Sequence, residues 1–245
     1  MMVIFEAKGI TKAFGGLLAN SNIDLTIDEG EIIGLIGPNG AGKTTFFNSI
    51  AGVFKPDEGK IIFCGENITG LPSETVCRKG IARTFQLVKI FKEMSVLENV
   101  MVGSFANTNS ALEARKRAFK ELEFFGFKEK AYEVAGGLTM PDQKRLELTR
   151  AMATNPKLLM LDEVMAGLTA SEVKDAVSLI KKINKDREIT FLIVEHVMEV
   201  IMPISDRVVV FDYGIKIAED VPEKIANNVD VIKAYLGDKY NASRS

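Results

Sequence analysis

Cysteine is scarce in this 245-residue sequence, in which Cys64 and Cys77 are the only two. They are too few for a disulfide framework and too far apart for a close-spaced zinc knuckle. Their scarcity indicates a reducing, cytoplasmic compartment. The first residues, MMVIFEAKG, also lack the basic leader, apolar stretch and cleavage site of a secretory signal, so the chain is expected to stay inside the cell.

The sequence has neither an excess of charge of one sign nor a long apolar run. Its 31 basic and 33 acidic residues give a net charge of -2, which argues against nucleic acid as a partner. The longest apolar runs, such as ITFLIV before Glu195, are far shorter than the ~20 residues that span a bilayer. Any membrane role is therefore expected to depend on a partner protein.

The apolar residues that are present, 47% of the total, suffice for the core of one large α/β domain. NIDLTID at 22–28 alternates strictly, which predicts a half-buried antiparallel strand. EIIGLIG at 31–37 is continuously apolar, which predicts a central strand buried on both faces. Three further runs, KLLMLDE, ITFLIVEH and DRVVVFDYG, alternate with helical stretches such as SEVKDAVSLIKKIN, so the sheet is expected to be mainly parallel.

Helical periodicity dominates the middle and the end of the chain. In the middle, SALEARKRAFKELEFF places four apolar residues on one predicted stripe: Leu112, Phe119, Leu122 and Phe125. Near the end, the apolar residues at helical spacing are Ile225, Val229, Ile232 and Leu236. No repeats or long linkers interrupt the pattern, so one domain is expected over 1–245. Its predicted parts are a core (1–86 and 155–220), an inserted helical subdomain (87–154) and a helical tail (221–245).

The segment GPNGAGKT at 37–44 matches the phosphate-loop pattern, and it stands between the predicted buried strand and the apolar-periodic TTFFNSIAGVF. Glycines let the backbone wrap phosphates with its N–H groups, and a helix N-terminus favours negative charge. Lys43 is expected to reach the β- and γ-phosphates of ATP, and Thr44 to supply a hydroxyl to Mg²⁺. The alternative is a glycine-rich turn without a ligand. The predicted nucleotide-binding residues here are Gly37, Pro38, Asn39, Gly40, Ala41, Gly42, Lys43, Thr44 and Thr45.

Two carboxylates follow another apolar run, in LLMLDE at 158–163. The end of a parallel strand would deliver Asp162 and Glu163 to the same sheet edge as the phosphate loop. Asp162 is expected to hold the metal. Glu163 is expected to orient and deprotonate the attacking water as general base. Both could instead be solvated residues at the end of a strand.

His196, the only histidine, also follows an apolar run, ITFLIVE. A lone histidine is more often structural. However, the phosphate loop, Gln86 in IARTFQ, Asp162-Glu163 and His196 follow one another in the order that is found in the ATP-binding cassette family. The sequence resembles this family over essentially the whole chain. The resemblance implies that Gln86 joins Mg²⁺ and the water, and that His196 senses the γ-phosphate. It also implies that Phe14 in TKAFGG stacks on adenine, although a core or turn aromatic is the alternative.

Two stretches, GIARTFQLVKIFKEMSVLENVMVG and the ending VIKAYLG, are similar in particular to the ATPases of branched-chain amino acid importers. The resemblance implies a P-loop NTPase core with an N-terminal antiparallel β subdomain and an inserted helical subdomain. It implies transmembrane permease subunits and a second ATPase as partners, an indirect link to a substrate-binding protein, and a position on the inner face of the membrane. Phe91, Met94 and Leu97 are candidate permease contacts, or alternatively packing residues of the helical subdomain.

The chain departs from this family at its signature, normally Leu-Ser-Gly-Gly-Gln, which meets ATP held by the opposite subunit. Residues 138–142 here read LTMPD. Met140 and Pro141 replace glycines that permit close backbone approach, and Asp142 is expected to bring negative charge near a phosphate. Thr139 is nevertheless expected to cap the following helix, with Asp142 as its capping-box partner, and to contact nucleotide.

The resulting functional prediction is an ATP-hydrolysing subunit that energises an importer, with ATP and Mg²⁺ as cofactors. One alternative is a soluble cassette of translation or DNA repair, but that class typically has two cassettes in one chain, zinc-binding cysteines or long coiled coils. Another is a regulatory module that binds ATP without useful turnover, which the altered signature motivates.

Overall fold

The structure is a computed structural model that describes residues 2–236. One of its two sheets is antiparallel, in the order β2-β1-β4-β5. Its strands are β1 (Val3–Phe14), β2 (Leu17–Asp28), β4 (Glu58–Phe63) and β5 (Glu66–Asn67). The antiparallel strand predicted at 22–28 is confirmed, because it forms the second half of β2 and pairs with β1.

The second sheet has the order β10-β9-β3-β8-β7-β6, in which all neighbours are parallel except the edge strand β10. Its strands are β3 (Ile32–Ile36), β6 (Ile81–Arg83), β7 (Leu158–Asp162), β8 (Thr190–Val194), β9 (Arg207–Asp212) and β10 (Ile215–Asp220). All five residues of β3 are buried between β8 and β9, as its continuous apolar sequence predicts. The strand pairing confirms a mainly parallel core.

The buried residues of β3 contribute to two hydrophobic cores, one on each face of the sheet. Ile33 and Leu35 pack into the core that contains Phe46 and Phe47 of the first helix, α1 (Lys43–Ile50). Ile32 and Ile36 pack into the larger core on the other face. Because the two faces of one strand are both covered, β3 and the loop that follows it have a fixed position relative to α1.

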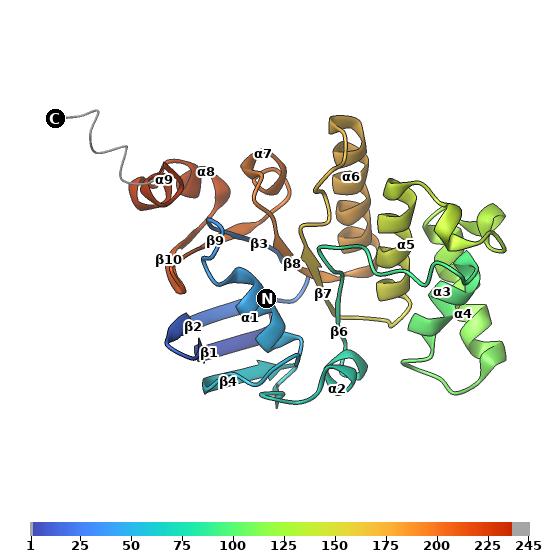
Figure 1. Cartoon of the computed structure of the whole chain (residues 1–245), viewed down its shortest axis with the longest axis horizontal. Helices are drawn as coiled ribbons and strands as arrows, with labels where there is room; N and C mark the ends of the chain where they lie inside the picture. Colours follow the sequence, from blue (N-terminus) through green and yellow to red (C-terminus); the bar gives the residue numbers. More distant parts are fainter. Residues whose placement is uncertain (1, 237–245) are drawn as a thin grey trace.

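The remaining helices are gathered at the two ends of the molecule and along the parallel sheet (Figure 1). They are α2 (Ser73–Arg78), α3 (Val96–Ser104), α4 (Ala111–Phe124), α5 (Met140–Met152), α6 (Ala170–Arg187), α7 (Met198–Ile201), α8 (Pro222–Ala226) and α9 (Val229–Leu236). Figure 1 shows α3, α4 and α5 at one end, and α8 and α9 at the other end beside β9 and β10. The first group falls within the predicted helical subdomain at 87–154, whose limits remain a prediction.

The predicted stripe of α4 is wrong at Leu112, which is 81% exposed. The buried face is instead centred on Ala114 and Ala118, together with Leu122. Small alanines let α4 approach α3 closely, so the packing turns the helix away from its first large apolar residue. Periodicity identified the helix but not its rotation.

The tail prediction needs a similar correction. Two helices form where one periodic segment was expected, and Val229 is 57% exposed while Ile225 and Val231 are each 1% exposed. Asn228 separates the helices and caps the second one, because its side-chain oxygen accepts hydrogen bonds from the N–H groups of Asp230 (2.9 Å) and Val231 (3.2 Å). Residues 237–245 of the predicted tail lie outside the described residues.

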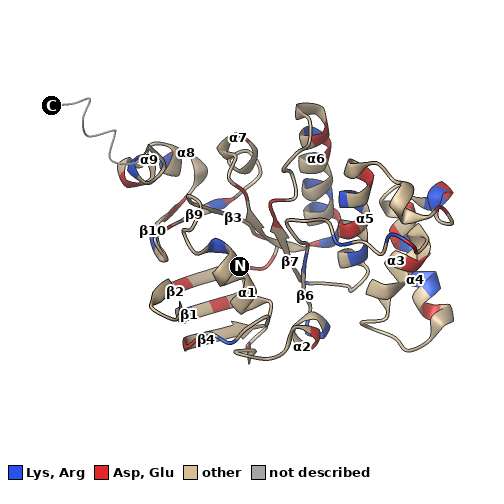
Figure 2. Cartoon of the chain, in the orientation of Figure 1, with Lys and Arg blue, Asp and Glu red and all other residues tan. Residues whose placement is uncertain are grey.

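The surface charges are mixed rather than segregated. Figure 2 shows Lys and Arg among Asp and Glu along α4, α5 and α6. Over residues 2–236, no helix combines the length and the apolar character needed to cross a membrane.

Candidate functional site

The loop between β3 and α1 has the geometry of a phosphate cradle. α1 begins at Lys43, and its N-cap residue is Gly42, in a left-handed conformation (φ 93°) and without a side chain that could cap the helix. The first N–H groups of a helix have no partner within the helix, so those of α1 are available to an anion. Thr44 is exposed and Thr45 half-buried in this first turn, and Asn39 and Gly40 are exposed at the tip of the loop.

Lys43 is folded back onto the loop. Its Nζ donates to the carbonyl oxygens of Gly37 (2.6 Å) and Pro38 (2.9 Å), and the residue is only 6% exposed. Burial lowers the pKa of Lys43, while the negative charges of Glu163 and Asp162 oppose that shift. The ammonium group therefore lies in the field of both carboxylates, over the centre of the loop.

Two glycines of the loop are required by close approach as well as by backbone conformation. A Cβ at Gly37 (φ 150°) would lie 2.2 Å from the carbonyl oxygen of Phe211, and one at Gly42 would lie 2.3 Å from that of Ala19. Asn20, fully buried in β2, also donates from its side-chain amide to the Gly42 carbonyl (3.1 Å). The loop is thus held between the end of β9 and the start of β2.

The ends of β6, β7 and β8 bring three predicted residues together. Glu163 follows β7 with its backbone in the left-handed region (φ 49°), and its N–H donates to the Val194 carbonyl (2.9 Å). Its Oε2 accepts a hydrogen bond from Nε2 of Gln86 (2.9 Å) and lies 3.7 Å from Nδ1 of His196. Asp162 ends β7 and is 4% exposed. The predicted general base, the glutamine and the histidine therefore form one cluster.

Arg83, which the sequence analysis did not single out, adds a positive charge to this edge. Its guanidinium donates to Oδ1 of Asn48 on α1 (2.6 Å) and lies 3.4 Å from Oδ2 of Asp162. Burial raises the pKa of Asp162, the charge of Glu163 adds to that shift, and the charges of Arg83 and Lys43 oppose it. The only signal in the sequence that could have identified Arg83 was its position at the end of β6. This strand has three residues, which are too few to show the periodicity that would predict it.

Glu195 was also missed, although it directly precedes the single histidine. It is 1% exposed, and its Oε1 accepts a hydrogen bond from the Met165 N–H (3.0 Å). Burial raises the pKa of this carboxyl group, although the Met165 hydrogen bond opposes the shift. Glu195 thereby anchors the segment that leads from Glu163 to α6.

Phe14 lies at the end of β1, where the hairpin turns into β2. Its ring is 47% exposed and packs edge-on against Phe54 at a centroid separation of 5.3 Å. The Lys12 ammonium lies 5.5 Å from the ring centre. Phe14 is therefore not a core residue, and part of its surface is available for stacking.

The altered signature forms a capped helix start. Thr139 is the N-cap of α5 and accepts a hydrogen bond from the Asp142 N–H (3.4 Å), and Pro141 lies in the first turn. The capping prediction for Thr139 is confirmed, but the reciprocal part of the capping box is wrong. The Asp142 carboxylate is instead bound by Lys130 (2.7 Å) and Arg145 (2.5 Å).

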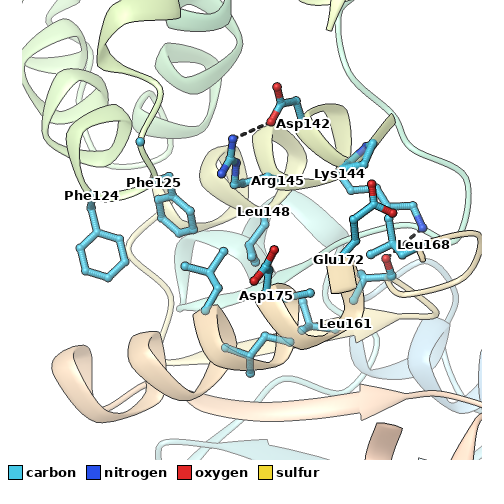
Figure 3. Close-up of a pocket in the computed structure, with 16 residues that line it drawn as sticks. Phe124, Phe125, Asp142, Lys144, Arg145, Leu148, Leu161, Leu168, Glu172 and Asp175 are labelled. Atoms are coloured by element: carbon cyan, nitrogen blue, oxygen red, sulfur yellow. Dashed lines mark hydrogen bonds and ion pairs between the residues drawn. The ribbon is translucent and has the colours of Figure 1, made fainter. Parts of the chain in front are cut away.

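These two bases pair the negative charge of Asp142, which is expected near a phosphate, within its own chain. Burial acts to raise the pKa of Asp142, but the hydrogen bond from Lys130 and the charges of Arg145 and Lys130 outweigh it and hold the pKa below its ordinary value. Figure 3 shows Asp142 paired with Arg145 at the rim of an apolar cavity of about 390 Å³ between α5 and α6. The carboxylate is therefore ionised and neutralised within the helical part of its own chain.

The start of α5 is also tied to the segment after Glu163. Nζ of Lys144 donates to the carbonyl oxygen of Val164 (2.9 Å) and to that of Ala166. Thr169 is the N-cap of α6 and forms a capping box with Glu172.

A family model described as ABC transporter matches residues 20–166, a span that contains the phosphate loop, Gln86 and Glu163. The chain belongs to the ABC transporter family of ATP-binding cassettes. This cassette is accordingly an ATPase. A second model, described as branched-chain amino acid ATP-binding cassette transporter, matches residues 216–241.

Individual relatives extend the similarity to almost the whole cassette. It is 44% identical to the high-affinity branched-chain amino acid transport ATP-binding protein BraF of Pseudomonas aeruginosa, over 96% of this chain and 98% of the relative. It is similar in structure to the ADP conformation of MJ1267, an ATP-binding cassette of an ABC transporter, with a TM-score of 0.88 and 32% identity over 97% of this chain and all of the other. A dimeric post-hydrolysis state of the cassette MJ0796, bound to ADP and Pi, matches with a TM-score of 0.79 and 26% identity over 89% of this chain and 99% of the other.

Proposed function

We propose that this cassette hydrolyses ATP to energise an importer of branched-chain or related amino acids. The observation that carries the proposal is the 44% identity to a branched-chain amino acid transport ATP-binding protein across nearly the whole chain. The geometry supports the ATPase part, because the phosphate loop and the Gln86–Glu163–His196 cluster lie at the same edge of the parallel sheet.

Nucleotide binding is assigned to the loop and to the β1–β2 hairpin. The ammonium of Lys43 would exchange the carbonyl oxygens of Gly37 and Pro38 for the β- and γ-phosphates, which are stronger, charged acceptors. The free N–H groups at the start of α1 would bind phosphate oxygens, and Phe14 would stack on the adenine. The loop does not need to fold around its ligand, because the neighbouring strands already hold it in shape.

The metal ligands we assign are Thr44, Gln86 and Asp162. They fit Mg²⁺, because the exposed Thr44 hydroxyl and the buried Asp162 carboxylate are hard oxygen donors beside the loop. When bound, Mg²⁺ would neutralise charge on the phosphates. Arg83 would keep the Asp162 carboxylate oriented and partly compensated before the nucleotide arrives.

Hydrolysis is assigned to Glu163. Its carboxylate would accept a proton from a water whose oxygen attacks the γ-phosphorus, while the bond from that phosphorus to the bridging oxygen breaks and releases ADP. Gln86 and His196, which already flank the Glu163 carboxylate, would orient this water and contact the γ-phosphate. Both residues face the same carboxylate oxygen, Oε2 of Glu163, so both are positioned to contact a water bound there.

The proposed partners are a second ATPase subunit and transmembrane permease subunits, which would place the cassette on the cytoplasmic face of the membrane and link it to a substrate-binding protein. The similarity to the dimeric MJ0796 cassette supports a second ATPase subunit as a partner. In such a pair, Thr139 and the N-terminus of α5 would approach nucleotide held by the other subunit.

A groove between the core and the helical part supports permease docking. It has a volume of about 500 Å³. The segment that follows α1, together with α2 and β6, lines one side, and α3 and α5 line the other. Val53, Val102 and Phe105 line it and are 38% to 56% exposed. An amphipathic helix from a membrane subunit would bury these side chains. Of the earlier candidates, Phe91 and Met94 are partly exposed, whereas Leu97 is 4% exposed and belongs to the core, so its proposed permease contact is wrong.

Phe105→Asp is expected to break this docking while leaving the isolated ATPase active. A charge buried against an apolar helix from the permease should weaken the complex by about 30-fold or more. Co-purification with co-expressed permease subunits and uptake of labelled leucine measure the effect. Leu112→Asp, on the exposed face of α4, is the matched control. Normal uptake by the Phe105 variant would rule out this groove, and uptake that does not depend on the cassette would reject the proposed function.

Restoring the family signature is expected to accelerate hydrolysis in the assembled complex. The variant carries Thr139→Ser, Met140→Gly, Pro141→Gly and Asp142→Gln, which returns the N–H donor that proline lacks. One recovered hydrogen bond to phosphate corresponds to about a fivefold gain. The measurement is the steady-state ATPase rate of the complex at saturating Mg-ATP.

Asp142→Gln alone is the comparison for that experiment. It should give no gain in rate and a lower melting temperature, because Lys130 and Arg145 lose their shared acceptor. An unchanged rate in the fourfold variant would mean that the Met140-Pro141 signature carries no cost.

A further inference from the structure

The tail and the phosphate loop are connected by a hydrogen bond between residues far apart in the sequence. The backbone N–H of Gly37 donates to the hydroxyl oxygen of Tyr235 at 2.8 Å. Gly37 is the first residue of the loop, and Tyr235 lies in the last turn of α9. The bond therefore joins the nucleotide site to the C-terminal helix.

Gly37 is located where the sheet no longer supports it. The β3–β8 ladder ends at the pair Leu35 and Val194, and the β3–β9 ladder ends at the pair Ile36 and Val210, so the Gly37 N–H lies beyond the last pair of both. Tyr235 supplies the missing acceptor. On its other side, Gly37 contacts the Phe211 carbonyl so closely that no Cβ would fit. The entry to the loop is thus clamped between β9 and α9.

The same glycine also binds the side chain of Lys43. The Gly37 carbonyl accepts a hydrogen bond from Nζ of Lys43 at 2.6 Å. If Lys43 turns to a phosphate, Gly37 loses that contact, whereas its hydrogen bond to the Tyr235 hydroxyl does not involve Lys43. Tyr235 therefore matters most in the nucleotide-bound state, in which the loop has to keep its shape.

Tyr235 is itself held firmly. It is half-buried, and α9 packs through Val231 and is capped by Asn228. Burial raises the pKa of Tyr235, although the Gly37 hydrogen bond opposes the shift, so the phenol stays protonated at physiological pH and has a fixed rather than a titrating role.

We propose that Tyr235 is a positioning residue for ATP binding, through which α9 holds the first peptide of the phosphate loop in its binding conformation. The segment matched by the branched-chain cassette model, 216–241, contains both α9 and this tyrosine. The inference rests on the proposed function, because it assumes that the loop binds ATP. It assigns the C-terminal segment a task in the nucleotide site rather than in contact with a partner.

The test removes only the hydroxyl oxygen, with Tyr235→Phe. Expected results are a rise of about two- to tenfold in both the Kd for a fluorescent ATP analogue with Mg²⁺ and the KM for ATP, with kcat nearly unchanged. Amide hydrogen exchange in a peptide containing Gly37 should also become faster. Tyr132→Phe is the matched control, because its hydroxyl contacts only the exposed Arg115 at 3.0 Å in the helical part.

The outcomes separate this inference from the proposed function. Unchanged Kd and KM in Tyr235→Phe would overturn it, and so would a lower melting temperature without a change in Kd, because either result would leave the tyrosine a structural role only. Lys43→Ala is measured in parallel. If that variant retains full ATP affinity, the proposed function of the loop fails. If it loses affinity while Tyr235→Phe keeps it, only the role of Tyr235 fails.

Discussion

Glu163→Gln is expected to lower the rate of ATP hydrolysis by about 10²- to 10⁴-fold while ATP binding persists. The amide keeps the size of the side chain and an oxygen for the Gln86 contact (2.9 Å), but it has no basic site for the proton of the attacking water. Glutamate and glutamine tolerate the left-handed backbone at position 163 equally, so the substitution should not change folding.

The measurement combines steady-state phosphate release with the molar mass of the purified variant by light scattering, with and without Mg-ATP. Glu93→Gln, at an exposed position, is the control. A dimer in Mg-ATP would mean that the signature at 138–142 closes on nucleotide, and a monomer would mean that closure needs a different ATPase or the permease. Hydrolysis that survives at the parent rate would remove Glu163 from the mechanism. If the parent protein hydrolyses ATP and Glu163→Gln abolishes that activity, the alternative of a regulatory module that binds ATP without turnover is also excluded.

Lys43→Ala is expected to weaken ATP binding by about 10- to 150-fold, because hydrogen bonds to charged groups contribute about 1.5–3 kcal/mol. Loss of the ammonium also removes charge compensation for Asp162 and Glu163, which interact electrostatically with Lys43. Titration of a fluorescent ATP analogue measures the affinity.

Folding stability should respond in the opposite way. Burial lowers the pKa of Lys43, which means that the ATP-free fold disfavours the charged form of this side chain. Lys43→Ala removes the buried ammonium group, so the melting temperature of the variant should be unchanged or higher. Lys60→Ala, at an exposed position on β4, is the control for loss of one positive charge. A variant that loses affinity only because it unfolds would contradict this account of the site.

The parts of the fold that the sequence predicted correctly depend on local patterns. Alternation at 22–28 and the continuous apolar run at 31–37 identified an antiparallel strand and a central one, because each pattern records which strand faces are buried. Helix rotation depends on the neighbouring helix instead. The exposed positions of Leu112 and Val229 followed from the packing of alanines on α4 and of Val231 on α9, which no local pattern contains.

The site divides in the same way. Lys43, Asp162 and Glu163 were predicted because the loop and the strand end are continuous motifs. Arg83 and Tyr235 were not, because their partners lie 79 and 198 residues away in the chain. The negative charge of Asp142 was predicted, but its pairing was not, because only the fold brings Lys130 and Arg145 to it.

The position of β3 has a consequence for the synthesis of the protein. β3 and the phosphate loop leave the ribosome early, but the strands on both sides of β3 are β8 and β9, which begin at Thr190 and Arg207. Until those residues emerge, the nascent chain holds an unpaired apolar strand with exposed backbone edges, the kind of segment that aggregates or recruits chaperones. ATP binding then becomes possible only after β8 and β9 have been synthesised, so a chain that terminates before Thr190 would not compete with the cassette for nucleotide.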